Sequence, residues 1–483
     1  MASRKGQARI ETDELGEVTI PAGCYWGIGT SRALEVFSAT GRPSHSLLIE
    51  AVVQVKKACA QTNGELGLLP RQIVSAITQV CDEILSGQWR EQFVVDAVHG
   101  GAGAGLIINI NEVLANRASE ILGDSLESLA SVNATKHVNL SQSNNDVYTT
   151  AMRIACLSAT KKLQATVLEM ERLLRRKSLE FERVVKVGRT ALRDDAPITL
   201  GQEFNCFGST IEHGLRRIKD ASHHLEEIGL GGRSVGTGFN TAPDFHNVVV
   251  RHLSQLTGFS LRAADDYFRL TQSMSDFVAV SSSLRELAAD LAKIATDLRL
   301  MGSGPTAGFG EIKLPDSILQ QSPLWPDVLP KTGIPPLTES LLMVCYQVIG
   351  NDHVVCLAAQ AGQLENNTLT PVIIDNILVS VSMLQTALDI FNHHCLIKIT
   401  ADTFKCRETL DRSSALIAAL TTEVGYQKAI EIIDSARAQK IDVREYLQST
   451  TTVSKSSLDK IFHYKYLTTP HLLEAGTPPE NPE

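Results

Sequence analysis

Basic clusters, paired cysteines and aromatic residues are all scarce in this sequence of 483 residues. Lys and Arg number 45 against 54 Asp and Glu, and a net charge of −9 without a basic stripe excludes nucleic acid as an expected partner. The nine cysteines include no CxxC pair, so the thiols are predicted to be reduced and to hold neither zinc nor disulfides. No apolar run reaches the roughly 18 residues of a bilayer span, and no signal-peptide core begins the chain. We therefore expect a soluble, cytoplasmic protein without a membrane partner.

Long segments without Gly or Pro occupy the middle of the chain. Residues 149–187 form one such segment, which as a helix would extend about 60 Å. Residues 265–301 form another, with apolar side chains at steps of three and four. Such helices need long neighbours to bury their apolar faces, and residues 199–228 and 336–400 are predicted to supply them. The sequence therefore predicts a mainly all-α fold with an elongated central helical bundle.

Smaller domains are expected on either side of this bundle. The predicted division is an N-terminal domain over residues 1–140, the bundle over 141–400 and a small helical C-terminal domain over 401–483. Within the outer domains, helices are predicted at residues 46–66, 70–86, 413–420, 426–439 and 442–448. A bundle with several apolar faces usually forms oligomers, and clefts between chains are common sites for small molecules.

Two clusters in the first third of the chain could carry chemistry. Residues 98–105 contain four glycines, which either let the backbone approach a ligand or simply form a flexible turn. In residues 137–148, Ser143, Asn144 and Asn145 begin a predicted helix, whose free N–H groups could hold a carboxylate. Capping alone would need only one of these residues, which favours a function for the second cluster.

Two further clusters lie at later helix boundaries. Residues 188–197 form a polar turn, which alone is best explained as a solvated connection. Residues 301–336 are dense in Gly and Pro and follow a long predicted helix. A loop of this length is either a lid that delivers a catalytic group or an ordinary surface excursion.

The clusters together resemble the aspartase/fumarase superfamily, and most closely its aspartase branch, over nearly the whole chain. The residues that carry the resemblance are Arg9–Gly16, Pro21–Gly27, Asn111–Asn116, Ser141–Asp146, Gly188–Thr190, Thr199–Glu203, Gly236–Asn240, Gly304–Pro305, Glu311–Pro315 and Val348–Asp352. The resemblance implies a helical homotetramer with active sites shared between chains. It also implies elimination of ammonia, an amine or water from a carboxylic acid, with no metal and no cofactor.

The sequence departs from the superfamily's catalytic loop. That loop has the form GSSxMPxKxNP and carries a serine base, whereas residues 316–340 of this chain contain no adjacent serine pair. Lys331 falls within one position of the expected lysine, and Ile334 stands where the asparagine belongs. Glu339 matches the superfamily's glutamate just beyond the loop.

The glycine-rich cluster departs as well. Ala104 and Gly105 occupy the Thr-Ser positions that would clasp the carboxylate next to the acidified carbon, and His99 replaces a glutamine. In contrast, Thr190 and part of the polar cluster are retained, so the other substrate carboxylate keeps its partners. A substrate with one carboxylate and a different electron-accepting group would suit this pattern.

The resulting hypothesis is a carbon–nitrogen lyase that does not act on aspartate. The specific expectation is an ergothionase-like release of trimethylamine from ergothioneine. The alternatives are an aspartate ammonia-lyase-type enzyme for another amino acid and a non-catalytic homologue kept for binding or assembly. The candidate catalytic residues are Lys331, Tyr148, His99 and Glu339, and the candidate substrate-binding residues are Ser143, Asn144, Asn145, Thr190 and His137. His137 has an alternative role as a satisfied histidine at a helix start, and Tyr148 as a packed core residue.

Overall fold

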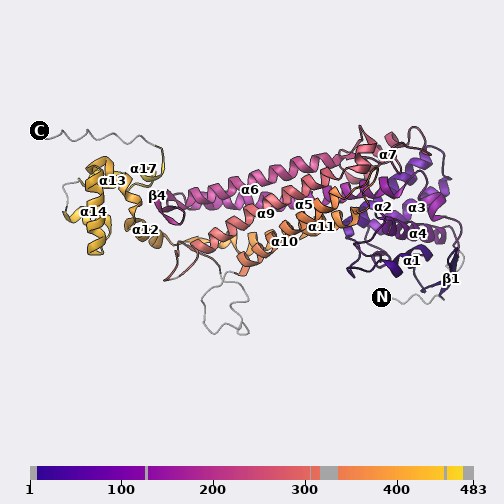
Figure 1. Cartoon of the computed structure of the whole chain (residues 1–483), viewed down its shortest axis with the longest axis horizontal. Coiled ribbons are helices and arrows are strands. Elements are labelled where there is room, and N and C mark those ends of the chain that lie inside the picture. Colours follow the sequence, from indigo (N-terminus) through magenta and orange to yellow (C-terminus); the bar gives the residue numbers. More distant parts are fainter. Residues whose placement is uncertain (1–7, 126–128, 305, 316–335, 451–453, 471–483) are drawn as a thin grey trace. The chain divides into compact units, whose positions relative to one another are not determined.

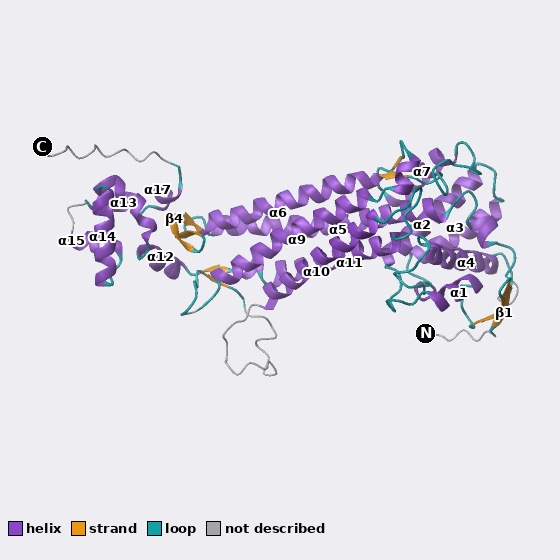
Figure 2. Ribbon diagram, in the orientation of Figure 1, coloured by secondary structure: helices purple, strands orange, loops and turns teal. Residues whose placement is uncertain are grey.

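The computed structural model describes residues 8–125, 129–304, 306–315, 336–450 and 454–470. Helices make up most of this part of the chain, and its strands form only two-stranded sheets (Figure 2). The expected mainly helical fold is therefore confirmed. All nine cysteines are free.

The N-terminal elements pack around a helical core. They are β1 (Arg9–Asp13), β2 (Gly16–Ile20), α1 (Ile28–Val36), α2 (Ser46–Glu65), α3 (Arg71–Leu85) and α4 (Ala104–Ile121). The strands β1 and β2 form an antiparallel hairpin, and α2, α3 and α4 lie side by side (Figure 1). Val52, Val55 and Cys59 are fully buried on one face of α2, because steps of three and four residues bring them to the same side of a helix.

Five long helices follow, and two of them lie in the predicted stretches without Gly and Pro. They are α5 (Asn144–Glu180), α6 (Leu200–His223), α9 (Ser275–Met301), α10 (Pro336–Gln360) and α11 (Thr370–His394). The apolar stripe of α9 is buried along its whole length, and Val280, Leu287 and Leu298 are 0% exposed. Burial of this stripe explains how a helix far longer than average is stabilised.

The expected boundaries of three helical segments are wrong. The first segment ends at Glu180 and continues into β3 (Val185–Thr190), which pairs with β4 (Arg193–Thr199). The second is divided by Ser273 and Met274 into α8 (Tyr267–Gln272) and α9. The third is divided into α10 and α11 by residues 361–369, where Gly362 and a pair of asparagines stop the helix.

Shorter elements connect these helices. They are α7 (Phe245–Thr257), the parallel pair β5 (Glu227–Ile228) and β6 (Arg262–Ala263), and the antiparallel pair β7 (Ile312–Lys313) and β8 (Thr400–Ala401). One π-helical turn, Ala134–Val138, comes shortly before α5. An irregular segment therefore precedes the start of α5.

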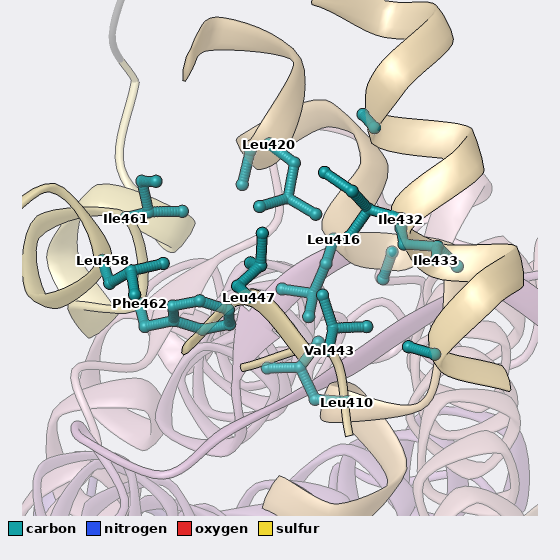
Figure 3. Packing of buried hydrophobic residues seen from close by; sticks show 14 of the residues in the cluster. Leu410, Leu416, Leu420, Ile432, Ile433, Val443, Leu447, Leu458, Ile461 and Phe462 are labelled. Carbon is teal, nitrogen blue, oxygen red and sulfur yellow. The ribbon is translucent and has the colours of Figure 1, made fainter. Parts of the chain in front are cut away.

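The C-terminal elements are short helices around their own apolar cluster. They are α12 (Thr403–Asp411), α13 (Ile417–Val424), α14 (Tyr426–Gln439), α15 (Val443–Thr450), α16 (Lys455–Ile461) and α17 (Tyr464–Thr468). Leu416, Ile433, Val443 and Phe462 lie in the cluster (Figure 3). The helix predicted at 426–439 is confirmed, and those predicted at 413–420 and 442–448 are confirmed with shifted ends.

The chain divides into two compact units, each of which is described by itself. Unit 1 contains Met1–Ala165, Arg216–Ala288 and Tyr346–Gln385, and unit 2 contains Thr166–Leu215, Ala289–Cys345 and Thr386–Glu483. Each unit holds a stretch of all five long helices. The division into domains 1–140, 141–400 and 401–483 stays a prediction.

Two helices exceed the apolar length expected from the sequence. Pro336–Gln360 and Thr370–Lys398 are long and apolar enough to cross a membrane. The expectation that no segment reaches this length and hydropathy is therefore wrong. Of the most apolar windows, 44% and 56% are buried within the chain, and core helices of bundle proteins have the same character.

Candidate active site

The start of α5 in unit 1 is fixed by a buried carboxylate. The backbone N–H and the hydroxyl of Ser143 donate to Oδ1 of Asp146, at 2.8 and 3.1 Å. The backbone N–H groups of Gly231 and Arg233 donate to Oδ2 of the same carboxylate, at 3.2 and 3.0 Å. Burial raises the pKa of Asp146, and the four donors oppose that rise. Asp146 therefore ties the helix start to the glycine-rich turn at residues 229–238.

A buried lysine supports the residues that lead into α5. Lys56 of α2 is 0% exposed, and its amine donates to Oδ1 of Asn139 at 2.7 Å and to Oε1 of Gln142 at 2.9 Å. Burial lowers the pKa of Lys56 to about 8. Asn63, on the same face of α2, donates to the carbonyl of Leu140 at 3.0 Å. Two polar side chains of α2 thus stabilise the segment 139–142.

Four of the predicted substrate-binding residues lie in this one segment. Asn144 and Asn145 begin α5, so their backbone N–H groups have no acceptor within the helix. The Asn145 amide donates to the carbonyl of Ser234 at 2.8 Å. Nδ1 of His137 accepts the backbone N–H of Asn133 at 3.0 Å. The structure thus brings Ser143, Asn144, Asn145 and His137 together at one helix start, and their binding of a substrate stays a prediction.

The glycine-rich cluster lies against Tyr148 in the same unit. Gly103 has φ +85°, and a Cβ there would lie 2.1 Å from Cδ2 of Tyr148, so only glycine leaves room for the ring. The Tyr148 side chain is 0% exposed, and its hydroxyl has no hydrogen-bond partner among the described residues. Burial raises the pKa of Tyr148, which keeps the phenol protonated at neutral pH.

His99 lies beside Tyr148 with both of its ring nitrogens engaged. Nδ1 donates to the carbonyl of Asp96 at 2.8 Å, and Nε2 accepts the N–H of Leu106 at 3.4 Å. This pattern defines the neutral imidazole with its proton on Nδ1, and burial lowers the pKa of His99. The rings of His99 and Tyr148 meet edge to face with centroids 6.5 Å apart. Proton transfer by either residue stays a prediction.

The remaining predicted residues belong to unit 2. Thr190 is exposed at the end of β3, and its hydroxyl donates to Oδ2 of Asp195 at 2.7 Å. Glu339 lies in the first turn of α10 and accepts from Nη2 of Arg299 at 3.0 Å. Lys331 lies outside the described residues. The catalytic role of Lys331 and Glu339 and the binding role of Thr190 stay predictions.

Sequence reasoning missed a buried ionic network in unit 2. The amine of Lys186 lies 2.7 Å from Oε2 of Glu203 and 2.8 Å from Oε2 of Glu311, which is 0% exposed. Nη2 of Arg189 lies 2.7 Å from the other oxygen of Glu311. This network joins β3, which contains Gly188–Thr190, to the segment Glu311–Pro315. The sequence carried a partial signal, because Lys186 stands among the valines 184, 185 and 187, and a charged residue in an apolar stretch indicates a buried ion pair.

The lysine at position 56 was missed as well, although its position carries a signal. Val52, Lys56, Cys59 and Asn63 recur at steps of three and four along α2, so the polar pair interrupts an apolar face. Such an interruption predicts polar partners on the segment that packs there. Among the described residues, no group of three or more His, Cys, Asp or Glu side chains is placed to hold a metal ion.

Comparisons with known proteins show the family to which the chain belongs. The family described as Lyase matches residues 16–350. The chain is 38% identical to aspartate ammonia-lyase of Bacillus subtilis (strain 168), covering 97% of this chain and 98% of the relative. It is 39% identical to fumarate hydratase class II of Nitrosomonas europaea, covering 91% and 94%.

Solved structures agree with this assignment. The fumarate lyase:delta crystallin from Brucella melitensis bound to cobalt matches with a TM-score of 0.91 and 38% identity, over 96% of this chain and all of that chain. The class II fumarase from Schistosoma mansoni matches with a TM-score of 0.88 and 28% identity, over 96% and 100%. The family match and these relatives thus define an elimination lyase. The chain belongs to the lyase family of the aspartase/fumarase superfamily.

Proposed function

We propose that this lyase breaks a carbon–nitrogen bond in a carboxylic acid other than aspartate, with ergothioneine as the best specific candidate. In this reaction a base removes a proton from carbon, the new carbon–carbon double bond forms, and trimethylamine leaves with the electron pair of the broken bond. The single observation that carries the proposal is the glycine-rich corner, where Ala104 and Gly105 offer no hydroxyl to a second carboxylate.

The surroundings of this corner support a planar, weakly charged group. Phe37 and His99 lie with ring centroids 6.1 Å apart, and the buried Tyr148 ring fills the space over Gly103. An unpartnered buried hydroxyl is costly, by about 1–3 kcal/mol, unless a bound group satisfies it. A protonated Tyr148 hydroxyl would donate a hydrogen bond to the charge that develops on the substrate's electron-accepting ring.

The start of α5 is the proposed place for the remaining carboxylate. The backbone N–H groups of Asn144 and Asn145 are the proposed donors there, with Ser143 and His137 beside them. Thr190 is proposed to join them in the assembled enzyme. Lys331 is the proposed base, with Glu339 near it in sequence. A lysine acts as a base only when burial or a neighbouring cation lowers its pKa, which is the physical condition for this assignment.

A homotetramer with active sites shared between chains is part of the proposal. In unit 1, α10 exposes Tyr346, Val354 and Leu357, at 63%, 38% and 48%. Large apolar side chains on one helix are expected to be covered by another chain rather than by water. We place the enzyme in the cytoplasm without a membrane or nucleic acid partner, since its net charge is −9 and its apolar helices fit a bundle core.

The test is an elimination screen with purified protein. Ergothioneine, aspartate, an argininosuccinate-like substrate and a betaine are offered in turn, and the ultraviolet absorbance of the new double bond is followed. Ergothioneine is expected to give the highest rate, and Lys331→Ala and Tyr148→Phe are expected to abolish or strongly reduce it. A rate that persists in both variants would reject the proposed acid and base.

Aspartate ammonia-lyase-type chemistry on another amino acid is the second candidate. It is favoured by the 38% identity to the Bacillus subtilis enzyme over almost the entire length of both chains. Release of ammonia in the same screen, with no release of trimethylamine, would support this candidate. A protein that binds these acids without turnover would instead be a non-catalytic homologue.

A further inference from the structure

A cavity in the C-terminal helices of unit 2 has a basic rim and an apolar floor. Its volume is about 360 Å³, within the range of small-molecule sites. It is lined by Arg412, Ile433, Ala436, Arg437, Lys440, Ile441 and Val443. The charged residues of this lining are all basic, although the chain as a whole carries a net charge of −9.

The floor of the cavity is the edge of the C-terminal apolar cluster. Ile433 and Ala436 come from the last two turns of α14, and Val443 begins α15 (Figure 3). These three side chains are 2%, 1% and 1% exposed, whereas Ile441 beside them is half-buried, so Ile441 supplies the apolar surface of the floor that a ligand can reach. A ligand that covers this floor would bury apolar surface, which is favourable without any directional contact.

The arginines of the rim have N–H donors that their acidic neighbours do not fully occupy. Nη1 of Arg412 lies 3.1 Å from Glu408, and Nη1 of Arg437 lies 3.7 Å from Asp434. The two arginine side chains are 60% and 58% exposed, and each guanidinium has five N–H donors. Single surface ion pairs of this kind leave most of those donors to water or to a ligand.

Lys440 is the most unusual member of the rim. It follows the last residue of α14 with φ +57°, and its N–H donates to the carbonyls of Ala436 and Arg437. This left-handed position at a helix end is one that glycine occupies most easily. A lysine therefore accepts backbone strain there, while its amine is brought to the mouth of the cavity.

A simpler explanation is that these cations only complement the helix dipoles. Arg412 follows the end of α12, and Arg437 and Lys440 lie at the end of α14. Cations do stabilise helix C-termini. However, one cation at each helix C-terminus would be enough to complement its dipole. Dipole compensation also does not account for a cavity with an apolar floor beside these cations.

We propose that this cavity binds a small organic anion, with a carboxylate or phosphate on the basic rim and a compact aromatic or aliphatic body on the apolar floor. The proposal is independent of the reaction assigned above, because none of the lining residues belongs to the candidate active site. The charged group would contact Arg437 and Lys440, and the body would cover the half-buried Ile441.

The test is calorimetric titration of the full chain with phenyl phosphate. Inorganic phosphate supplies the charge alone, and benzyl alcohol supplies the ring alone. Phenyl phosphate is expected to bind saturably and at least about tenfold more tightly than inorganic phosphate, and benzyl alcohol is not expected to bind detectably. Equal affinity for phenyl phosphate and inorganic phosphate would overturn the role of the floor.

Lys440→Gly is the decisive variant, since glycine suits the left-handed backbone and the substitution should not unfold the protein. It is expected to weaken phenyl phosphate binding about five- to tenfold, and Arg437→Gln should have a similar effect. Lys428→Gln, an exposed lysine on the same helix that does not line the cavity, is the matched control and should bind as the wild type does. Binding that is unchanged in both rim variants would lie elsewhere and would refute the proposal.

Discussion

The contact between Gly103 and Tyr148 gives a sharp test of the candidate active site. Gly103→Ala requires an alanine at φ +85°, which costs about 1–2 kcal/mol. Its Cβ would also lie 2.1 Å from Cδ2 of a ring that is 0% exposed, and overpacking of this kind adds about 1–3 kcal/mol. The free energy of unfolding is therefore expected to fall by about 2–5 kcal/mol.

A matched substitution separates the two contributions. Gly67 has φ +72° and no atom within 4 Å of its missing Cβ, so Gly67→Ala should cost only the backbone term of about 1–2 kcal/mol. Urea unfolding followed by circular dichroism compares the two variants. In a Tyr148→Ala background, Gly103→Ala should lose its excess cost. If Gly103→Ala costs no more than Gly67→Ala, the described packing of this corner is wrong.

Three further outcomes are expected from changes at buried ionisable side chains. Burial lowers the pKa of Lys56 from 10.5 to about 8, so between these pH values the unfolded chain binds more protons than the folded chain. The free energy of unfolding should therefore rise with pH over this window by up to about 3 kcal/mol, relative to the Lys56→Met variant. A flat difference between the two proteins over this window would contradict the burial of a charged Lys56. Burial also lowers the pKa of His99, so NMR should show its midpoint below 6.5, and stability should fall as pH drops through 6.5. Lys186→Met should cost about 1–3 kcal/mol in urea unfolding, because buried Glu311 loses one of its two cations and keeps only Arg189. Adding Glu311→Leu should recover part of that loss.

The overall fold was predictable because apolar periodicity and the absence of helix breakers act over long stretches. The stripe of α9 is an example, since its spacing alone predicts a buried helix. Helix ends were less predictable. Residues 181–187 lack Gly and Pro, yet Val185 begins a strand, because pairing with β4 outweighs local helix propensity.

The candidate site was predictable only in part. The sequence brought Ser143, Asn144 and Asn145 together because they are neighbours in the chain. It could not show that Lys56 donates to Asn139 and Gln142 just before them, because those contacts depend on how α2 packs. The unpartnered hydroxyl of Tyr148 was likewise invisible, since sequence patterns indicate burial but not hydrogen-bond partners.

The specificity of elimination tests the central claim most directly. The measurement is the ratio of kcat/KM for ergothioneine to that for aspartate, in the wild type and in the double variant Ala104→Thr/Gly105→Ser. The substitution restores the hydroxyls that superfamily members present at this corner, and the nearest atoms to the new Cβ at position 105 lie 3.2 Å away on His99 and Val95. The ratio should favour ergothioneine in the wild type and fall at least about tenfold in the double variant. A wild type that prefers aspartate, or a ratio that the two hydroxyls leave unchanged, would contradict the account.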